Sequence, residues 1–123
     1  MSVIEGRSGQ QEHGLTSFHV GEHCLWLGNP IHAASAGRPQ RLRILAKDVG
    51  IALTRPEDTS LLNILPVTLQ SIDLVREGHA LLGLRLSDGQ NLFAEITAWS
   101  RERLTLHEGL VVYAMIKSVA LAE

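Results

Sequence analysis

The fold class is decided at residues 80–97, where the sequence reads ALLGLRL-SDGQ-NLFAEIT. Two apolar runs, residues 80–86 and 91–97, flank the turn formers Asp88 and Gly89. An Asp-Gly pair between two such runs is the signal of a β-hairpin. Outside the hairpin, apolar runs and turn residues alternate in the same way along the chain. Further strands are therefore expected at residues 15–20, 24–27, 41–46, 49–53, 63–72 and 111–121.

One segment, residues 98–106, favours a helix. It is short, and the run His107-Glu108-Gly109 that follows predicts a glycine at the C-terminal end of this helix. Many short strands and one small helix predict an all-β chain, folded as a compact barrel of the OB kind.

The two halves of the chain resemble each other. Residues 13–26 run parallel to residues 79–93, and residues 43–49 run parallel to residues 113–119. The offset drifts only slightly between the two matches, as a single loop insertion would cause. A short repeated unit of this type predicts two related β subdomains.

The subdomains are expected at residues 1–54 and 55–123. A chain of 123 residues has room for one domain or two very small ones. Residues 1–12 match neither half. They are expected to be disordered, as the frayed start of an excised piece or a segment added to it.

Composition and charge limit the possible functions. Apolar residues make up 45% of the chain and charged residues 20%, as in ordinary globular proteins. The formal charge is −2, with acids and bases interspersed, which argues against nucleic acid or an anionic membrane as the main partner because both favour a basic patch. The single cysteine, Cys24, excludes an internal disulfide and fits a reducing cytoplasm. The sequence has no signal peptide and no apolar run long enough to span a bilayer.

Two segments far apart in the sequence together predict an anion site. Residues 59–63 (Thr-Ser-Leu-Leu-Asn) offer hydroxyls and free backbone N–H groups at a strand entrance, and residues 116–119 (Ile-Lys-Ser-Val) offer a lysine and a hydroxyl in the last strand. A small tetrahedral dianion is held by several short donors and one fixed positive charge. Taken alone, Ser60 with Asn63 is ordinary turn chemistry, and Lys117 is an ordinary solvated strand lysine. The prediction of an anion site therefore depends on the presence of both segments in one chain.

The two halves differ where this lysine occurs. The second half has Lys117-Ser118, whereas the first has Lys47-Asp48. A carboxylate at that position would repel an anion. The anion site is therefore expected in the second half.

Residues 58–66, 94–100 and 112–119 resemble the molybdate-binding Mop-type TOBE domain. From about residue 13 to its end, the chain resembles the C-terminal regulatory part of the ATP-binding subunit of molybdate ABC transporters. In that family the regulatory part follows a nucleotide-binding domain. Residues 41–49 are typical of the transporter subunit rather than of free-standing molybdate-binding proteins.

The resemblance implies a set of oxyanion ligands. Asn63 closes the Ser-x-x-Asn motif and is expected to fix its turn, while Thr97 and Ser100 match hydroxyls that the neighbouring subunit supplies. Many family members have arginine at the position of Leu62, so Lys117 is the only cation among the matched residues. The candidate oxyanion-binding residues are Ser60, Leu61, Leu62, Asn63, Thr97, Ser100, Lys117 and Ser118.

The resemblance also implies a function. Molybdate is a dianion with four acceptor oxygens, so its site should present donors and keep carboxylates out of contact. Tungstate has nearly the same size and charge and is expected to bind likewise, whereas the smaller sulfate has to be rejected by size. The chain is expected to be a cytoplasmic regulatory domain that senses either oxyanion at a homodimer interface. It would modulate transport with the nucleotide-binding domain and the permease subunits, at the cytoplasmic face of the inner membrane, and without a cofactor.

The chain is not expected to be an enzyme, because it lacks a P-loop and any persuasive catalytic order of Ser, His, Asp or Cys. A metal centre is not expected, since His19, His23 and Cys24 lack a fourth ligand. Two alternatives remain: a free-standing molybdate storage or buffering protein, and an OB-like nucleic-acid or oligosaccharide module with no oxyanion role. Asp48 in the first half favours regulation over storage. Five aromatic residues and a net charge of −2 argue against the OB-like module.

Overall fold

The computed structural model describes residues 1–28 and 37–121, and most of these residues lie in strands. Among these described residues, one short α-helix and one 3-10 helix interrupt the strands. The elements are β1 (Ser2–Glu12), β2 (Leu15–Val20), β3 (His23–Leu27), β4 (Pro39–Ile44), η2 (Ala46–Asp48), β5 (Val49–Ala52), β6 (Asn63–Arg76), β7 (His79–Arg85), β8 (Asn91–Thr97), α1 (Ala98–Leu104), β9 (Val111–Ile116) and β10 (Ala120–Leu121).

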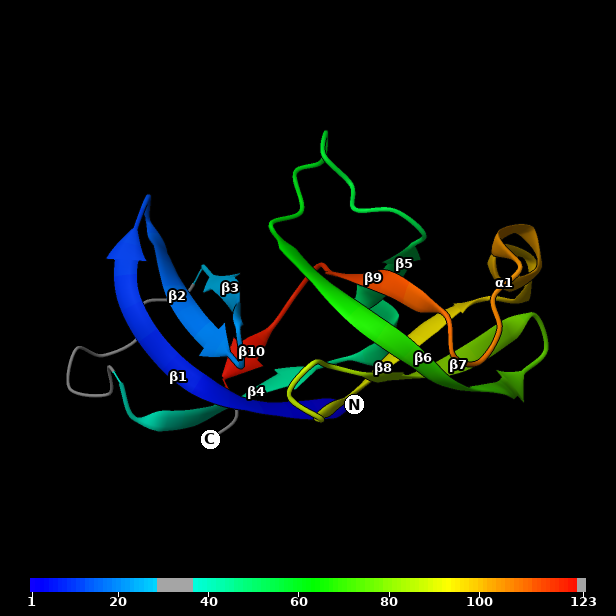
Figure 1. Ribbon diagram of the computed structural model, residues 1–123, viewed down its shortest axis with the longest axis horizontal. Coiled ribbons are helices and arrows are strands. Elements are labelled where there is room, and N and C mark those ends of the chain that lie inside the picture. Colours follow the sequence, from blue (N-terminus) through cyan, green and yellow to red (C-terminus); the bar gives the residue numbers. More distant parts are fainter. Residues whose placement is uncertain (29–36, 122–123) are drawn as a thin grey trace.

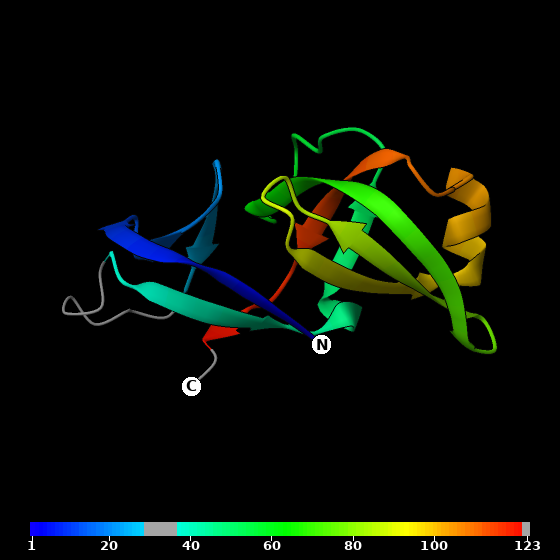
Figure 2. The ribbon, with the colours of Figure 1, turned by 60° about the horizontal axis from the view of Figure 1, so that its bottom comes forward.

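The strands form two five-stranded antiparallel sheets with the same internal order. The first sheet runs β10-β4-β1-β2-β3 and the second runs β5-β9-β6-β7-β8. Figures 1 and 2 show the two curled sheets joined side by side, with α1 at the far end of the second. Each long strand, β1 and β6, pairs with the following hairpin on one side and with β4 or β9 on the other. The prediction of an all-β, OB-like fold with two related subdomains is confirmed.

The two sheets exchange one strand each. β5 follows β4 along the chain but pairs with β9 in the second sheet, and β10 follows β9 but pairs with β4 in the first. The two connecting segments, residues 45–48 and 117–119, meet where the Lys117 N–H donates to the Asp48 carbonyl oxygen (2.8 Å). The single strand expected at residues 111–121 is wrong, because residues 117–119 leave one sheet and enter the other.

The repeat extends to single hydrogen bonds. The first residue of β6, Asn63, accepts from the Trp26 N–H in β3 (2.7 Å). The first residue of β1, Ser2, accepts in the same way from the Phe93 N–H in β8 (2.9 Å). Trp26 and Phe93 occupy equivalent positions in the two halves of the sequence repeat, so each subdomain begins with a polar side chain bound to the edge strand of the other.

The strand registers also correct the sequence alignment of the repeat. Ser2 pairs with Ile44 and Asn63 pairs with Ile116, so Ile44 is equivalent to Ile116 and not to Ala114. From Lys47 and Lys117 onward the sequence alignment is right. Two residues, Leu45 and Ala46, separate Ile44 from Lys47, whereas Ile116 and Lys117 are adjacent in the sequence, and Ala46 is the first residue of η2.

Residues 1–12 are not disordered. They supply β1, the central strand of the first sheet, in which Ser2, Ile4 and Ser8 are buried. The sheets also do not divide at residue 54, since β5 lies before that point and belongs to the second sheet, and β10 lies after it and belongs to the first. The division into folding units at residue 54 remains a prediction.

The helix and the hairpin follow their local signals to different degrees. The β7–β8 hairpin is confirmed, with Gly89 at φ 90° and its N–H bonded to the Leu86 carbonyl oxygen (3.0 Å). Helix α1 ends at Leu104, and the glycine cap is wrong: Thr105 ends the helix in the left-handed region at φ 52°. Gly109 lies in the turn before β9 instead.

One apolar core joins the two sheets. Phe18 and Ile44 from the first sheet and Leu65, Leu82 and Ile116 from the second are at most 2% exposed and belong to one contiguous cluster. The exchanged strands tie this core together, because β5 brings Val49 into the second sheet directly after the first-sheet strand β4. Within the described residues, no helix is long and apolar enough to cross a bilayer.

Candidate functional site

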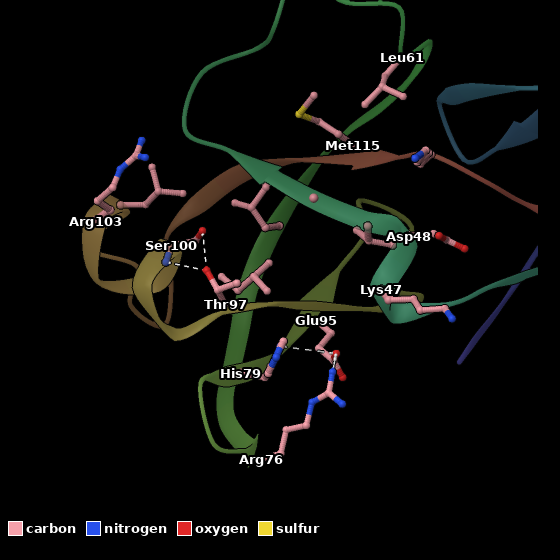
Figure 3. A pocket seen from close by; sticks show the side chains of 16 residues that line it. Lys47, Asp48, Leu61, Arg76, His79, Glu95, Thr97, Ser100, Arg103 and Met115 are labelled. Carbon is pink, nitrogen blue, oxygen red and sulfur yellow. Dashed lines mark hydrogen bonds and ion pairs between the residues drawn. The ribbon is translucent and has the colours of Figure 1, made fainter.

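A groove of about 770 Å³ lies beside the strand exchange. We call it the crossover groove. Its walls are η2 and β5 on one side and β8 and α1 on the other, and Lys117 lies where β9 leaves the second sheet. Figure 3 shows Thr97 and Ser100 at the α1 end and Lys47 and Asp48 at the η2 end.

The crossover groove brings together half of the predicted oxyanion residues. Leu61, Thr97, Ser100 and Lys117 line it, although they come from three separate parts of the sequence. The other four predicted residues, Ser60, Leu62, Asn63 and Ser118, are not among its lining residues. The groove therefore contains the hydroxyl pair and the lysine, but not the Ser-x-x-Asn motif itself.

The two hydroxyls at the α1 end form a fixed pair. Thr97 is the N-cap of α1, and its Oγ1 accepts from the Ser100 N–H (3.0 Å). The Thr97 hydroxyl donates in turn to Ser100 Oγ (2.9 Å). Because Ser100 accepts this bond, its own hydroxyl proton remains available for another acceptor in the groove.

Four more basic residues line the crossover groove besides Lys117, which was the only cation matched in the sequence. Arg76 bonds to the Glu95 carboxylate (3.1 Å), and His79 Nδ1 lies 3.8 Å from the same oxygen. Lys47 and Arg103 also line the groove, and among the described residues neither forms an ion pair or a side-chain hydrogen bond. The groove is therefore richer in positive charge than the sequence motif indicated.

Two carboxylates lie in the same groove, contrary to the expectation that the site would present donors only. Glu95 is paired with Arg76, and His79 lies beside the same carboxylate. Asp48 reaches the groove because the strand exchange carries the first-half segment Lys47-Asp48 into the second subdomain. The sequence repeat aligned Lys47 with Lys117, but it did not indicate that both lysines would line the same groove.

The Ser-x-x-Asn segment has a different role from the one expected. The Leu61 N–H donates to Thr59 Oγ1 (3.1 Å), so it is not free for an anion. Asn63 does not fix a turn: its side chain accepts from the Trp26 N–H (2.7 Å) and donates to the Trp26 carbonyl (3.0 Å). Asn63 is 8% exposed, and its amide fastens the start of β6 to β3 of the other sheet.

Ser118 does not line the crossover groove. It lines a second cavity of about 290 Å³, together with Arg43, Leu45 and Asp48, and Asp48 lines the crossover groove as well. Ser60 and Ser118 are both exposed. One protomer thus presents two sets of donors: Thr97, Ser100 and Lys117 line the groove, and the two exposed serines are not among its lining residues.

The histidines and the cysteine do not form a metal site in the described part of the chain, where no three His, Cys, Asp or Glu side chains are placed to hold an ion. His19 and Cys24 are cross-strand partners of β2 and β3, and Cys24 Sγ contacts the Leu25 carbonyl oxygen at 3.5 Å.

Residues 59–122, more than half of the chain, match the family described as TOBE domain. The molybdenum import ATP-binding protein ModC of Yersinia pestis is 38% identical over 109 residues, which cover 88% of this chain and 29% of that protein. ModC of Rhizobium meliloti (strain 1021) is 38% identical over 123 residues, which cover 98% of this chain and 33% of that protein. The chain therefore spans about a third of the length of these relatives.

A solved structure has the same architecture. The cytoplasmic molybdate-binding protein ModG, crystallised with molybdate bound, superposes with a TM-score of 0.77 over 98% of this chain and 94% of that one. The sequence identity is 21%, so this likeness concerns the fold.

Proposed function

The chain belongs to the TOBE domain family, and on that premise we propose that it binds molybdate as the regulatory domain of a molybdate importer's ATP-binding subunit. The observation that carries the proposal is the crossover groove, which gathers the Thr97–Ser100 hydroxyl pair and Lys117 in one hollow. The role is one of binding. Sensing the oxyanion in the cytoplasm would modulate transport by the full-length protein.

The donor chemistry of the groove suits a tetrahedral dianion. Hydrogen bonds to a charged group contribute about 1.5–3 kcal/mol each. The Ser100 hydroxyl and the Lys117 ammonium supply two such bonds, and the unpaired cations add long-range attraction. Tungstate has the same charge and nearly the same size, so the proposal includes it. Sulfate is smaller and would leave some of the donors without contact.

We propose further that the complete site forms in a homodimer. The donors of one protomer are divided between the groove and the exposed Ser60 and Ser118. A second copy that lays its exposed serines over the groove would reunite the two sets around one anion. Such an interface would also cover two exposed apolar side chains. Trp99 is 67% exposed and precedes Ser100 in α1, and Leu62 is 58% exposed and lies between Ser60 and Asn63. A two-fold interface of this kind repeats each contact and yields two equivalent sites.

The same proposal places the domain in a larger assembly. The relatives that it matches are about three times as long and are described as ATP-binding import proteins. We therefore propose a nucleotide-binding domain in the same polypeptide and permease subunits as partners. The complex would lie at the cytoplasmic face of the inner membrane.

A storage or buffering protein is the second candidate, since ModG, which shares the fold, is a cytoplasmic molybdate-binding protein. The relatives that the chain matches in sequence are ATP-binding import proteins, which favours the regulatory domain. The third candidate, an OB-like nucleic-acid module, is disfavoured by the net charge of −2 and by the small number of aromatic residues, five in the chain.

A thermal-shift screen tests the proposed function. A ligand that binds only the folded state stabilises it by RT ln(1 + c/Kd), where c is the free ligand concentration, so the effect grows with the logarithm of that concentration relative to Kd. Sodium molybdate and tungstate should raise the melting temperature of the chain, and sulfate and phosphate at the same ionic strength should not. An equal rise with all four anions would leave only nonspecific charge attraction and would contradict the proposal.

A further inference from the structure

The geometry points to Arg103 as a second cationic contact for the oxyanion, alongside Lys117. This inference rests on the proposed function and names a binding residue of the same groove. Arg103 lies outside the sequence motifs. It is assigned to the site because of its place on α1 and because no described residue pairs with its side chain.

The position of Arg103 follows from the helix period. Residues three apart on a helix lie on the same face, so Arg103 projects on the side of Ser100. Both residues line the crossover groove. Arg101, two positions earlier, lines a different cavity of about 550 Å³ together with Leu74 and Glu102. The helix thus directs its two arginines to two different hollows.

At the α1 end of the groove, Arg103 is the described cation that has no carboxylate partner. Arg76 is bound to Glu95, and His79 lies beside the same carboxylate. Lys47 extends from the opposite end of the groove and away from the Thr97–Ser100 pair (Figure 3). Arg103 is exposed, and no described residue pairs with its guanidinium. In Figure 3 the guanidinium turns away from the hydroxyl pair, so its side chain has to rotate to reach an anion there.

The chemistry of a guanidinium suits this task better than that of a second ammonium. Its planar fork donates two parallel N–H bonds, which match two oxygens of one tetrahedral anion, whereas an ammonium acts as a point charge. Lys117 and Arg103 would approach the anion from the two ends of the groove, with the Ser100 hydroxyl between them.

A structural role for Arg103 predicts something different. Both Arg101 and Arg103 lie in the last turn of α1, where a positive charge interacts favourably with the helix dipole. If the dipole were the only reason for Arg103, the two arginines would be interchangeable. Arg101→Gln is therefore the matched control for Arg103→Gln, since the two variants lose the same charge from the same helical turn.

Calorimetric titration of the chain with sodium molybdate tests the inference. Arg103→Gln should weaken binding at least tenfold, and Arg101→Gln should leave it within twofold of the unmodified chain. Arg103→Lys keeps the charge, loses the fork, and should fall between them. The melting temperatures without molybdate should drop alike in the two glutamine variants.

The outcomes separate the inference from the proposed function. If the unmodified chain binds molybdate and the two glutamine variants bind equally well, Arg103 is not a contact and the proposed function stands. Full affinity in Arg103→Lys together with a loss in Arg103→Gln would overturn the bidentate contact and leave only a charge effect. An unmodified chain that takes up no molybdate would overturn the proposed function and this inference with it.

Discussion

At the scale of single residues, Lys117 is a charged residue of the groove whose main chain is fixed by a hydrogen bond to the other connecting segment. Its N–H is bonded to the Asp48 carbonyl oxygen, so its main chain is fixed at the meeting point of the two connecting segments. The side chain is exposed and lines the groove.

Lys117→Ala should therefore weaken molybdate binding by about 1.5–3 kcal/mol, the range for a charge-assisted hydrogen bond. Lys47→Ala is the control because Lys47 has the equivalent position in the repeat and lines the same groove, but extends away from the hydroxyl pair. Its loss should cost much less. Equal losses of affinity in a titration of the two variants would show that the groove attracts the anion by overall charge and not through Lys117.

The hydroxyl pair gives a second prediction at this scale. Ser100→Ala removes a donor but keeps the Ser100 N–H bonded to Thr97, so it should weaken molybdate binding with little change in melting temperature. Thr97→Ala removes the N-cap as well and should also destabilise the fold by about 1 kcal/mol. Urea unfolding and titration of both variants separate the two effects. A Ser100→Ala variant with unchanged affinity would exclude this hydroxyl from the site.

At the scale of elements, the two subdomains are joined by exchanged strands and by one polar tie at the start of each long strand. Asn63 makes two hydrogen bonds to Trp26 in β3, and Ser2 makes one to Phe93 in β8. Both side chains are buried. If either were removed, the backbone group that it binds would lose a hydrogen bond that water restores poorly.

Asn63→Ala should lower the free energy of unfolding by about 1–3 kcal/mol, the cost of leaving buried groups unpaired. Ser2→Ala breaks only the single equivalent bond and should cost less. Urea unfolding of both variants provides the comparison. If Asn63→Ala were as stable as the unmodified chain yet lost molybdate binding, Asn63 would be a ligand contact and not a tie between the sheets.

The local elements could be predicted from the sequence, and the pairing between distant elements could not. The Asp-Gly hairpin at residues 80–97 is encoded within a few residues, and so is the short helix at residue 98. The exchange of β5 and β10 depends on which sheet edge a strand meets after a short connection, and no local pattern records that. Strand β1 was missed because the sequence comparison gave it no partner, although its burial alternates as in a regular strand over residues 2–5.

The candidate site was predictable to the same extent. Lys117 was found from its motif, and Thr97 and Ser100 were found from the family resemblance, which implied that a neighbouring subunit supplies the two hydroxyls. All three residues line one groove of the same chain. Asp48 and Lys47 were assigned to the other subdomain, because only the strand exchange carries them into this groove. Arg103 was missed for a different reason: its signal is the i, i+3 spacing from Ser100, which has meaning only once the helix and the groove are known.

At the scale of the whole molecule, the division of donors between the groove and the outer surface predicts a ligand-dependent dimer. A ligand that binds only the dimer stabilises it by mass action. Molybdate should therefore raise the dimer fraction at low protein concentration in analytical ultracentrifugation, and Trp99→Ser, which removes an exposed apolar side chain, should lower it. A chain that stays monomeric at all concentrations with molybdate bound would refute the shared site.

The most direct test of the central claim is a calorimetric titration of the chain with sodium molybdate, run beside an identical titration with sodium sulfate. The account predicts saturable binding of molybdate that approaches one anion per protomer, because each groove contains one hydrogen-bonded hydroxyl pair and one Lys117. Sulfate should give no saturable heat at the same concentrations. No uptake of molybdate, or the same response to both anions, would contradict the claim that this groove is a selective oxyanion site.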